Sequence, residues 1–279
     1  MTDYALTLCD VTSRRLAGVS LALLPGEIAG VVGAQAAGKS TLLRIAAGCI
    51  APRAGEVRVC GPVGFAPETP VFPPVLTVRE VLAYYARLHT TRLRHSALVR
   101  EALDISGLGA SAELRASGLG KADLHRLAFA QAALGGRRVL LLDETLCGLD
   151  AFARRDLVSR IAHLAATGVA VLITARDPAV LERLAARVLV LQGGRIVRAG
   201  ALASLLAERV LEVVLDVPPR EPPPGFRITA TGLETPLNGR TAESALALCR
   251  AHRLAVRASR VRVKSLEEIV LETHDAAVR

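Results

Sequence analysis

Short apolar runs alternate along this chain with stretches whose apolar residues recur at helical spacing. Residues 4–11 and 19–24 read as short strands, and residues 25–33 lead through a turn into an apolar run that ends in glycine. Helical spacing follows from Lys39, with Gly48 at the position of a C-terminal cap. The pattern therefore predicts a buried strand, a loop and the start of a helix in direct succession.

The middle of the chain continues the alternation. Thr77 and Glu80 form a capping box, and helical character extends from there to about residue 134. The later segments read in turn as strand, helix, strand and hairpin, at residues 137–144, 154–168, 169–174 and 188–200. Strands that alternate with helices predict an α/β fold.

The texture changes beyond residue 210, which suggests a second domain. Residues 218–226 are proline-rich, and we expect a joint near them. The segments that follow read as strand, helix, strand and helix, at residues 227–233, 241–252, 254–263 and 265–273. Ser265 and Glu268 predict a second capping box. The predicted domains are 1–210 and 211–279, the first with a helical subdomain at about 77–134.

The amino-acid composition argues against some classes of function. The 279 residues are 51% hydrophobic and include no Trp, and a 3% aromatic share argues against a base-stacking nucleic-acid module. The net charge of +9 is compatible with nucleic acid or an anionic surface, but the arginines are scattered as on an ordinary solvated face. The five cysteines lack metal-ligand spacing, so we expect buried thiols. We see no charged-then-apolar leader at the start of the sequence. No apolar run reaches the roughly 18 residues that a membrane-spanning helix needs.

Lys39 is one of only three lysines among 35 basic residues, and it lies in a phosphate-binding pattern. Gly33, Gly38, Lys39 and Ser40 match G-x-x-x-x-G-K-[ST]. Glycines let backbone N–H groups wrap phosphates, the lysine neutralises the terminal phosphates, and the serine hydroxyl ligates Mg²⁺. The predicted nucleotide-binding residues of this loop are Gly33, Ala34, Gln35, Ala36, Ala37, Gly38, Lys39, Ser40 and Thr41.

Two acidic residues follow the apolar run at 139–142. A carboxylate at the end of a buried strand, here Asp143, can hold Mg²⁺, and Glu144 beside it can orient or deprotonate water. Together with the upstream loop they predict a nucleoside triphosphatase.

The order of these stretches resembles the ATP-binding subunit of ABC transporters over residues 5 to about 205. The segments that carry the resemblance are GAQAAGKST, FAPETPVFPPVLTVRE, LGKADLHRLAFAQAAL, VLLLDETLCGLD and VLITARD. The tail VRVKSLEEIVLET is similar to that of the drug-exporting, daunorubicin-resistance branch. The resemblance implies a P-loop ABC-type ATP-binding domain with a helical subdomain and a small C-terminal αβ segment, ATP and Mg²⁺ as cofactors, and head-to-tail pairing of two such domains.

Several family positions are altered. The signature, LSGGQ in the family, aligns with residues 119–123, where Gly120 and Lys121 replace Ser and Gly. The helix start and the Lys121 charge remain to attract a partner's phosphate, whereas Asp123 opposes it. Asp150 stands where the family places the aspartate that couples two sites. The resemblance thus assigns Gly120, Lys121 and Asp150 to a dimer interface.

Two further replacements concern the terminal phosphate. Glu68 aligns with the glutamine that senses Mg²⁺ and water, and Arg176 aligns with the histidine that contacts the γ-phosphate. Arginine holds phosphate by charge but does not shuttle a proton. We hypothesise that Glu68 and Arg176 form a compensating ion pair. Near the expected adenine, Arg14 either stacks by its planar face or leaves the base to apolar contact.

The resemblance implies an ATP-binding subunit of a membrane exporter, peripheral at the cytoplasmic face and bound to a transmembrane permease subunit. Its second ATP-binding subunit is either a copy of this chain or a partner for which this chain is the degenerate half. We expect ATP binding, slow hydrolysis by a self-paired dimer, and no direct nucleic-acid contact. A soluble ABC-type ATPase acting on nucleic acid or ribosomes, and a non-hydrolysing nucleotide-gated subunit, remain the alternatives.

Overall fold

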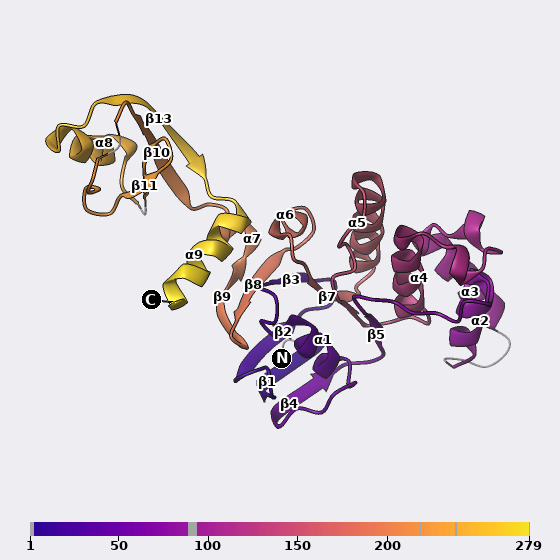
Figure 1. Ribbon diagram of the computed structural model, residues 1–279. Coiled ribbons are helices and arrows are strands. Elements are labelled where there is room, and N and C mark those ends of the chain that lie inside the picture. Colours follow the sequence, from indigo (N-terminus) through magenta and orange to yellow (C-terminus); the bar gives the residue numbers. More distant parts are fainter. Residues whose placement is uncertain (1–2, 89–93, 218, 238, 279) are drawn as a thin grey trace. The chain divides into compact units, whose positions relative to one another are not determined.

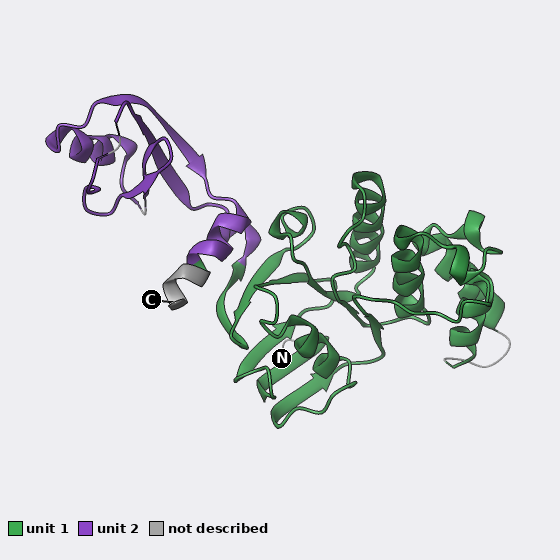
Figure 2. Ribbon diagram, viewed as in Figure 1, with its two compact units in different colours: residues 1–200, 273–279 green, residues 201–272 purple. Residues whose placement is uncertain are grey.

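The computed structural model describes residues 3–88, 94–217, 219–237 and 239–278, with side chains up to residue 273. The chain divides into two compact units (Figure 2), residues 1–200 with 273–279 and residues 201–272. In the described part of the chain, no helix is long and apolar enough to cross a membrane.

A six-stranded sheet forms the centre of the first unit (Figure 1). Its order is β5 (Val63–Ala66), β6 (Val139–Leu142), β7 (Ala170–Thr174), β3 (Ile28–Val32), β8 (Arg187–Gln192) and β9 (Arg195–Ala201). The pairs from β5 to β8 are parallel. β3, β6 and β7 are buried along their whole length, as expected for parallel strands covered on both faces. The predicted α/β fold is confirmed.

A second, antiparallel sheet packs with the first around one hydrophobic core. It contains β2 (Val19–Leu23), β1 (Leu6–Thr12) and β4 (Ala54–Val59) in this order. The core joins side chains of β1, β2, β3, β6, β7 and β8 with those of α1 (Lys39–Ala46). Packing therefore fixes the end of β3 and the start of α1 in position.

Further helices of this unit follow α1 along the chain. They are α2 (Val78–Arg87), α3 (His95–Ser106), α4 (Lys121–Ala133), α5 (Ala151–Ala166) and α6 (Pro178–Leu181), with short 3-10 turns at Gly109–Ser111 and Ala116–Gly118. α2, α3 and α4 lie together around a core of their own (Figure 1). The capping box of Thr77 and Glu80 at the start of α2 is confirmed.

The second unit is a four-stranded antiparallel sheet with helices. The order is β11 (Arg227–Thr229), β12 (Gly232–Pro236), β10 (Arg209–Leu215) and β13 (Val256–Val263). Its helices are α7 (Leu202–Leu205), α8 (Ala242–Ala251) and the first part of α9 (Leu266–Val278), up to Glu272. Ser265 and Glu268 exchange the hydrogen bonds of the second capping box, from Ser265 N to Glu268 Oε2 at 2.9 Å and from Glu268 N to Ser265 Oγ at 3.3 Å.

Three details differ from the sequence-based expectations. The boundary between the two compact units falls after Gly200, whereas the sequence placed the domain boundary at 210. The described part of the proline-rich segment 218–226 lies inside the second unit. The stretch 227–233, expected as one strand, turns back at residues 230–231 and pairs β11 with β12. Among the cysteines only Cys249 is buried, and the expectation of buried thiols is wrong for three that are exposed, Cys9, Cys49 and Cys60.

Candidate nucleotide-binding site

The loop between β3 and α1 needs glycine at both ends. Gly33 has φ 157° and a Cβ there would lie 2.1 Å from the Leu191 carbonyl oxygen, while Gly38 has φ 108° and a Cβ there would lie 2.9 Å from the Arg15 carbonyl oxygen. Gly38 is the N-cap of α1 and supplies no side-chain cap. The first N–H groups of α1 therefore remain available for an anion.

Lys39 holds its ammonium group over this loop. The side chain is buried, and Nζ donates to the carbonyl oxygens of Gly33 at 2.8 Å and Ala34 at 3.2 Å. Nζ also lies 3.6 Å from Glu144 Oε1. The first residue of α1 thus places one positive charge between the loop and a buried carboxylate.

Asp143 and Glu144 follow β6 and are buried. Thr174, the last residue of the neighbouring β7, donates its hydroxyl to Asp143 Oδ1 at 2.8 Å and accepts from Glu144 N at 2.9 Å. Among the described residues, no group donates a hydrogen bond to the buried Asp143 Oδ2 or Glu144 Oε2. Asp143 Oδ2 is therefore free for a cation or a water, whereas Glu144 Oε2 faces the Arg176 guanidinium. Thr174 was not predicted from the sequence, where its only signal is its place at the end of an apolar strand.

Burial determines the proton affinity of Glu144. Desolvation raises the pKa of its carboxyl group above the ordinary 4.5, against the opposing attraction of Lys39 and Arg176. Arg176 Nε lies 3.7 Å from Glu144 Oε2. A carboxyl group with a raised pKa in a nucleotide pocket is suited to accept a proton from water.

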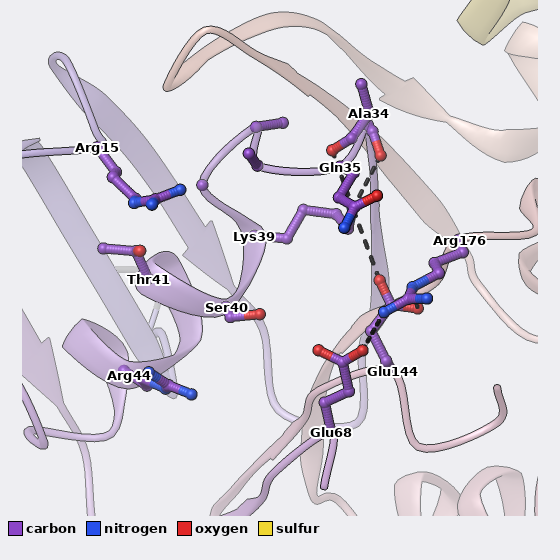
Figure 3. A pocket seen from close by; sticks show the side chains of 14 residues that line it. Arg15, Ala34, Gln35, Lys39, Ser40, Thr41, Arg44, Glu68, Glu144 and Arg176 are labelled. Carbon is purple, nitrogen blue, oxygen red and sulfur yellow. Dashed lines mark hydrogen bonds and ion pairs between the residues drawn. The ribbon is translucent and has the colours of Figure 1, made fainter.

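Glu68 and Arg176 form the ion pair that the sequence led us to hypothesise. Arg176 Nη2 donates to Glu68 Oε1, and both side chains are partly exposed. Together with the contacts of Glu144 this gives an alternating row of charges, Lys39, Glu144, Arg176 and Glu68, which we call the charge row (Figure 3). Three separate chain segments after β5, β6 and β7 converge in it with α1.

Most of the predicted nucleotide-binding and catalytic residues line one cavity of about 510 Å³. It is lined by residues 33–41, by Glu68, Glu144 and Arg176, and by two unpredicted residues, Arg15 and Arg44. Arg14 does not line it. The Ser13 hydroxyl accepts from Arg15 N at 3.2 Å and Leu16 N at 3.1 Å, and this tight turn brings the next arginine to the cavity instead. Asp143 is fully buried and does not line the cavity.

The predicted dimer-interface residues lie outside this cavity. Gly120 is the N-cap of α4 and Lys121 its first residue, and a Cβ on Gly148 would lie 2.2 Å from Lys121 Nζ. Asp150 caps α5 by accepting from Phe152 N and Ala153 N, both at 2.9 Å. Asp123, expected to oppose a phosphate, pairs with Arg126 at 3.2 Å. The structure thus brings Lys121 next to the segment that leads to Asp150.

The site fits a magnesium-bound triphosphate in its donor set. It offers uncapped helix N–H groups and the Lys39 ammonium for phosphate, and the Ser40 hydroxyl with buried Asp143 for the metal. Among the described residues, no cluster of three or more His, Cys, Asp or Glu side chains is arranged to hold a metal ion. Magnesium prefers few protein ligands in combination with substrate phosphates.

Comparisons with known proteins agree with this geometry. A family model described as ABC transporter matches residues 16–147. The Nod factor export ATP-binding protein I of Paraburkholderia xenovorans is 34% identical over 69% of this chain and 68% of its own length, and that of Rhizobium etli is 30% identical over 72% and 68%.

Solved structures share the fold. The dimeric post-hydrolysis ATP-binding cassette MJ0796, bound to ADP and Pi, has a TM-score of 0.64 and 21% identity over 71% of this chain and 98% of its own. The cbiO1 protein of Clostridium perfringens, part of the ABC transporter complex cbiONQ, has a TM-score of 0.66 and 20% identity over 74% and 91%. With the loop, the acidic pair and the cavity described above, the likeness to the two export ATP-binding proteins shows that the chain belongs to the family of ABC transporter ATP-binding subunits.

Proposed function

We propose that this chain is the ATP-binding subunit of an ABC exporter and couples ATP binding and hydrolysis to export. The observation that carries the proposal is the cavity in which the uncapped start of α1 and Lys39 face the buried Glu144, which directly follows Asp143 in the chain. The two relatives named for Nod factor export support the direction of transport.

Each residue of the site has a role in this proposal. Lys39 and the loop N–H groups bind and orient the phosphates, and Ser40 and Asp143 hold Mg²⁺, with Glu68 as a further ligand. When bound, the metal neutralises charge on the terminal phosphates. Glu144 orients the attacking water and accepts its proton.

Turnover by a self-paired dimer is expected to be slow. Arginine holds phosphate by charge but does not shuttle a proton, so Arg176 cannot replace the histidine in proton transfer. The altered signature removes a hydroxyl that the family directs at a partner's phosphate, and loss of one such contact costs about 100- to 1,000-fold in rate. The chain then serves as the ATP-retaining half of a heterodimer whose partner contributes most of the hydrolysis.

The proposed partners are a transmembrane permease and a second ATP-binding subunit, with Gly120, Lys121 and Asp150 at the contact between the two ATP-binding chains. The chain would be peripheral at the cytoplasmic face of the membrane. Two of the solved relatives support assembly, one by its dimeric form and one by its place in a transporter complex.

Calorimetric ATP titration and phosphate release test the proposal. The wild-type chain should bind Mg²⁺–ATP, Lys39→Ala should weaken binding at least about tenfold, and Arg100→Ala, an exposed change on α3, should not. Phosphate release should be slow from the lone chain, rise with permease and partner subunit, and fall in Glu144→Gln. No ATP binding at millimolar concentration would refute the nucleotide site, and fast release by the lone chain would refute the heterodimer role.

A further inference from the structure

Another hollow lies between α5 and α6, and Asp177 in its lining directly follows Arg176 of the nucleotide cavity. Its volume is about 300 Å³. Three arginines line it, Arg154 and Arg155 from α5 and Arg183 from the segment after α6. Val158, Val180 and two alanines supply apolar lining, and Asp177 is its single acidic group. The hollow therefore combines an apolar lining with an excess of positive charge.

The three arginines differ in what they already contact. Arg154 Nη2 donates to the Leu149 carbonyl oxygen at 3.1 Å, and Nη1 lies 3.9 Å from Asp177 Oδ2. Arg155 and Arg183 are exposed and have no ion pair or hydrogen bond within the described ranges of the chain. Arg154 is thus engaged by contacts within the chain, whereas the guanidinium groups of Arg155 on α5 and of Arg183 after α6 are free to bind an anionic group.

We infer that this hollow docks an acidic segment of a partner protein, one in which carboxylates alternate with aliphatic side chains. Guanidinium groups pair bidentately with carboxylates, and the alanine and valine lining accepts aliphatic groups that a bare phosphate lacks. Nucleic acid is a poorer match, because no aromatic side chain lines the hollow to stack a base. The net positive charge and the apolar lining of the hollow together favour a segment that carries both carboxylates and aliphatic side chains.

The position of the hollow connects it to the site. Asp177 caps α6 by accepting from Ala179 N at 3.0 Å, and it directly follows Arg176 of the charge row. Arg154 joins Asp177 to Leu149, the residue before Asp150. A docked segment would therefore contact the elements that carry Arg176 and Asp150. The docking itself requires no bound nucleotide, so it stands or falls independently of the proposed transport function.

Fluorescence anisotropy with the full-length chain tests the inference. The probe is a short fluorescein-labelled peptide in which Glu and Leu alternate, compared with one peptide carrying Gln for Glu and another carrying Ser for Leu. The double variant Arg155→Glu with Arg183→Glu should weaken binding of the Glu-Leu peptide at least about tenfold. The control variant, Arg100→Glu with Arg195→Glu, makes the same charge change at exposed arginines of α3 and β9 and should bind like wild type.

Four results would overturn the inference. The first is no binding of the Glu-Leu peptide, and the second is equal weakening by the control variant, which would indicate general attraction to a basic protein. The third is equal binding of the Glu-Ser peptide or equal competition by inorganic phosphate, which would indicate a simple anion site. The fourth is equal binding of the Gln-Leu peptide. Circular dichroism of both double variants checks that each is folded, and Arg155→Lys with Arg183→Lys should retain most of the affinity if either has unfolded.

Discussion

At the scale of single residues, we propose that the Glu68–Arg176 ion pair compensates for two departures from the family pattern. Either replacement alone would change the charge next to the terminal phosphate, whereas the two together would leave it neutral. Arg176→His should leave Glu68 without its partner beside Glu144 and reduce phosphate release by the assembled transporter. The double variant Glu68→Gln with Arg176→His should recover part of the loss, with a coupling of about 1 kcal/mol or more. Strictly additive effects in the rate measurements would argue against compensation.

Glu144 should give the first unit a characteristic pH dependence. Its pKa is raised in the folded state by burial, so the folded protein takes up the proton more readily than the unfolded chain. The stability that this group contributes is complete below its ordinary 4.5 and is lost as pH rises through the folded value. The unfolding free energy of wild type relative to Glu144→Gln should therefore fall with rising pH above 4.5 and then level off.

Urea unfolding of both proteins across this range measures the slope, with Lys39 and Arg176 present in each. A difference that grows with pH would mean that these two cations stabilise the carboxylate more than burial penalises it, and would refute the prediction.

The residues that the sequence could identify are those whose chemistry depends on a linear motif. Lys39, Glu144, Glu68 and Arg176 were predicted from the order of short segments, and they share one cavity. The sequence pointed to Arg14, whereas Arg15 lines the cavity. A turn held by the Ser13 hydroxyl decides which of the two arginines faces the cavity. Thr174 could not be assigned, since its role is a contact to Asp143 across two strands that lie far apart in sequence.

At the scale of elements, β13 contributes a hub of ion pairs to the second unit. Arg262 binds Glu268 through two hydrogen bonds at 2.6 and 2.7 Å, and it also pairs with Glu212 and with the buried Glu234. These carboxylates raise the pKa of the guanidinium, so the charge persists at any working pH. The arginine connects β10, β12 and the start of α9 to one strand.

Arg262→Met should destabilise the second unit by about 2 kcal/mol, because it leaves carboxylates on three elements without their shared partner. The matched control is Arg260→Met on the same strand, where the side chain is 74% exposed and, within the described part of the chain, pairs with Glu212 alone, and it should cost less than about 1 kcal/mol. Chemical denaturation of both variants measures the difference. Equal costs would show that the hub contributes no more than an ordinary surface pair.

Elements with a strong local signal were predictable and those fixed by pairing were not. The two capping boxes marked the starts of α2 and α9, since both partners lie three residues apart in sequence. The turn between β11 and β12 was missed. Gly232 has φ 154° and its position is crowded by the Val213 carbonyl oxygen, a neighbour on β10 that only strand pairing supplies.

At the scale of the whole molecule, the chain places its nucleotide chemistry and its arginine hub in different compact units. The cavity and the charge row belong to residues 1–200, and Arg262 with its partners belongs to residues 201–272. The sequence placed the boundary at 210, because the proline-rich segment was the visible discontinuity. β10 lies before those prolines, yet its hydrogen bonds are made with β12 and β13, so pairing assigns it to the second unit.

This division predicts how ligand binding shifts thermal unfolding. A ligand that binds only the folded state stabilises it by about 2.7 kcal/mol at 100 times its dissociation constant. For a unit of this size that corresponds to a rise of about 5 to 10 °C. In differential scanning calorimetry, Mg²⁺–ATP should raise the transition of the first unit and leave that of the second, whereas Arg262→Met should lower only the second. Lys39→Ala should abolish the ATP shift without moving the Arg262-sensitive transition. A single transition that responds to both changes would mean that the two units unfold as one cooperative structure, and the separation of function by unit would then have no energetic counterpart.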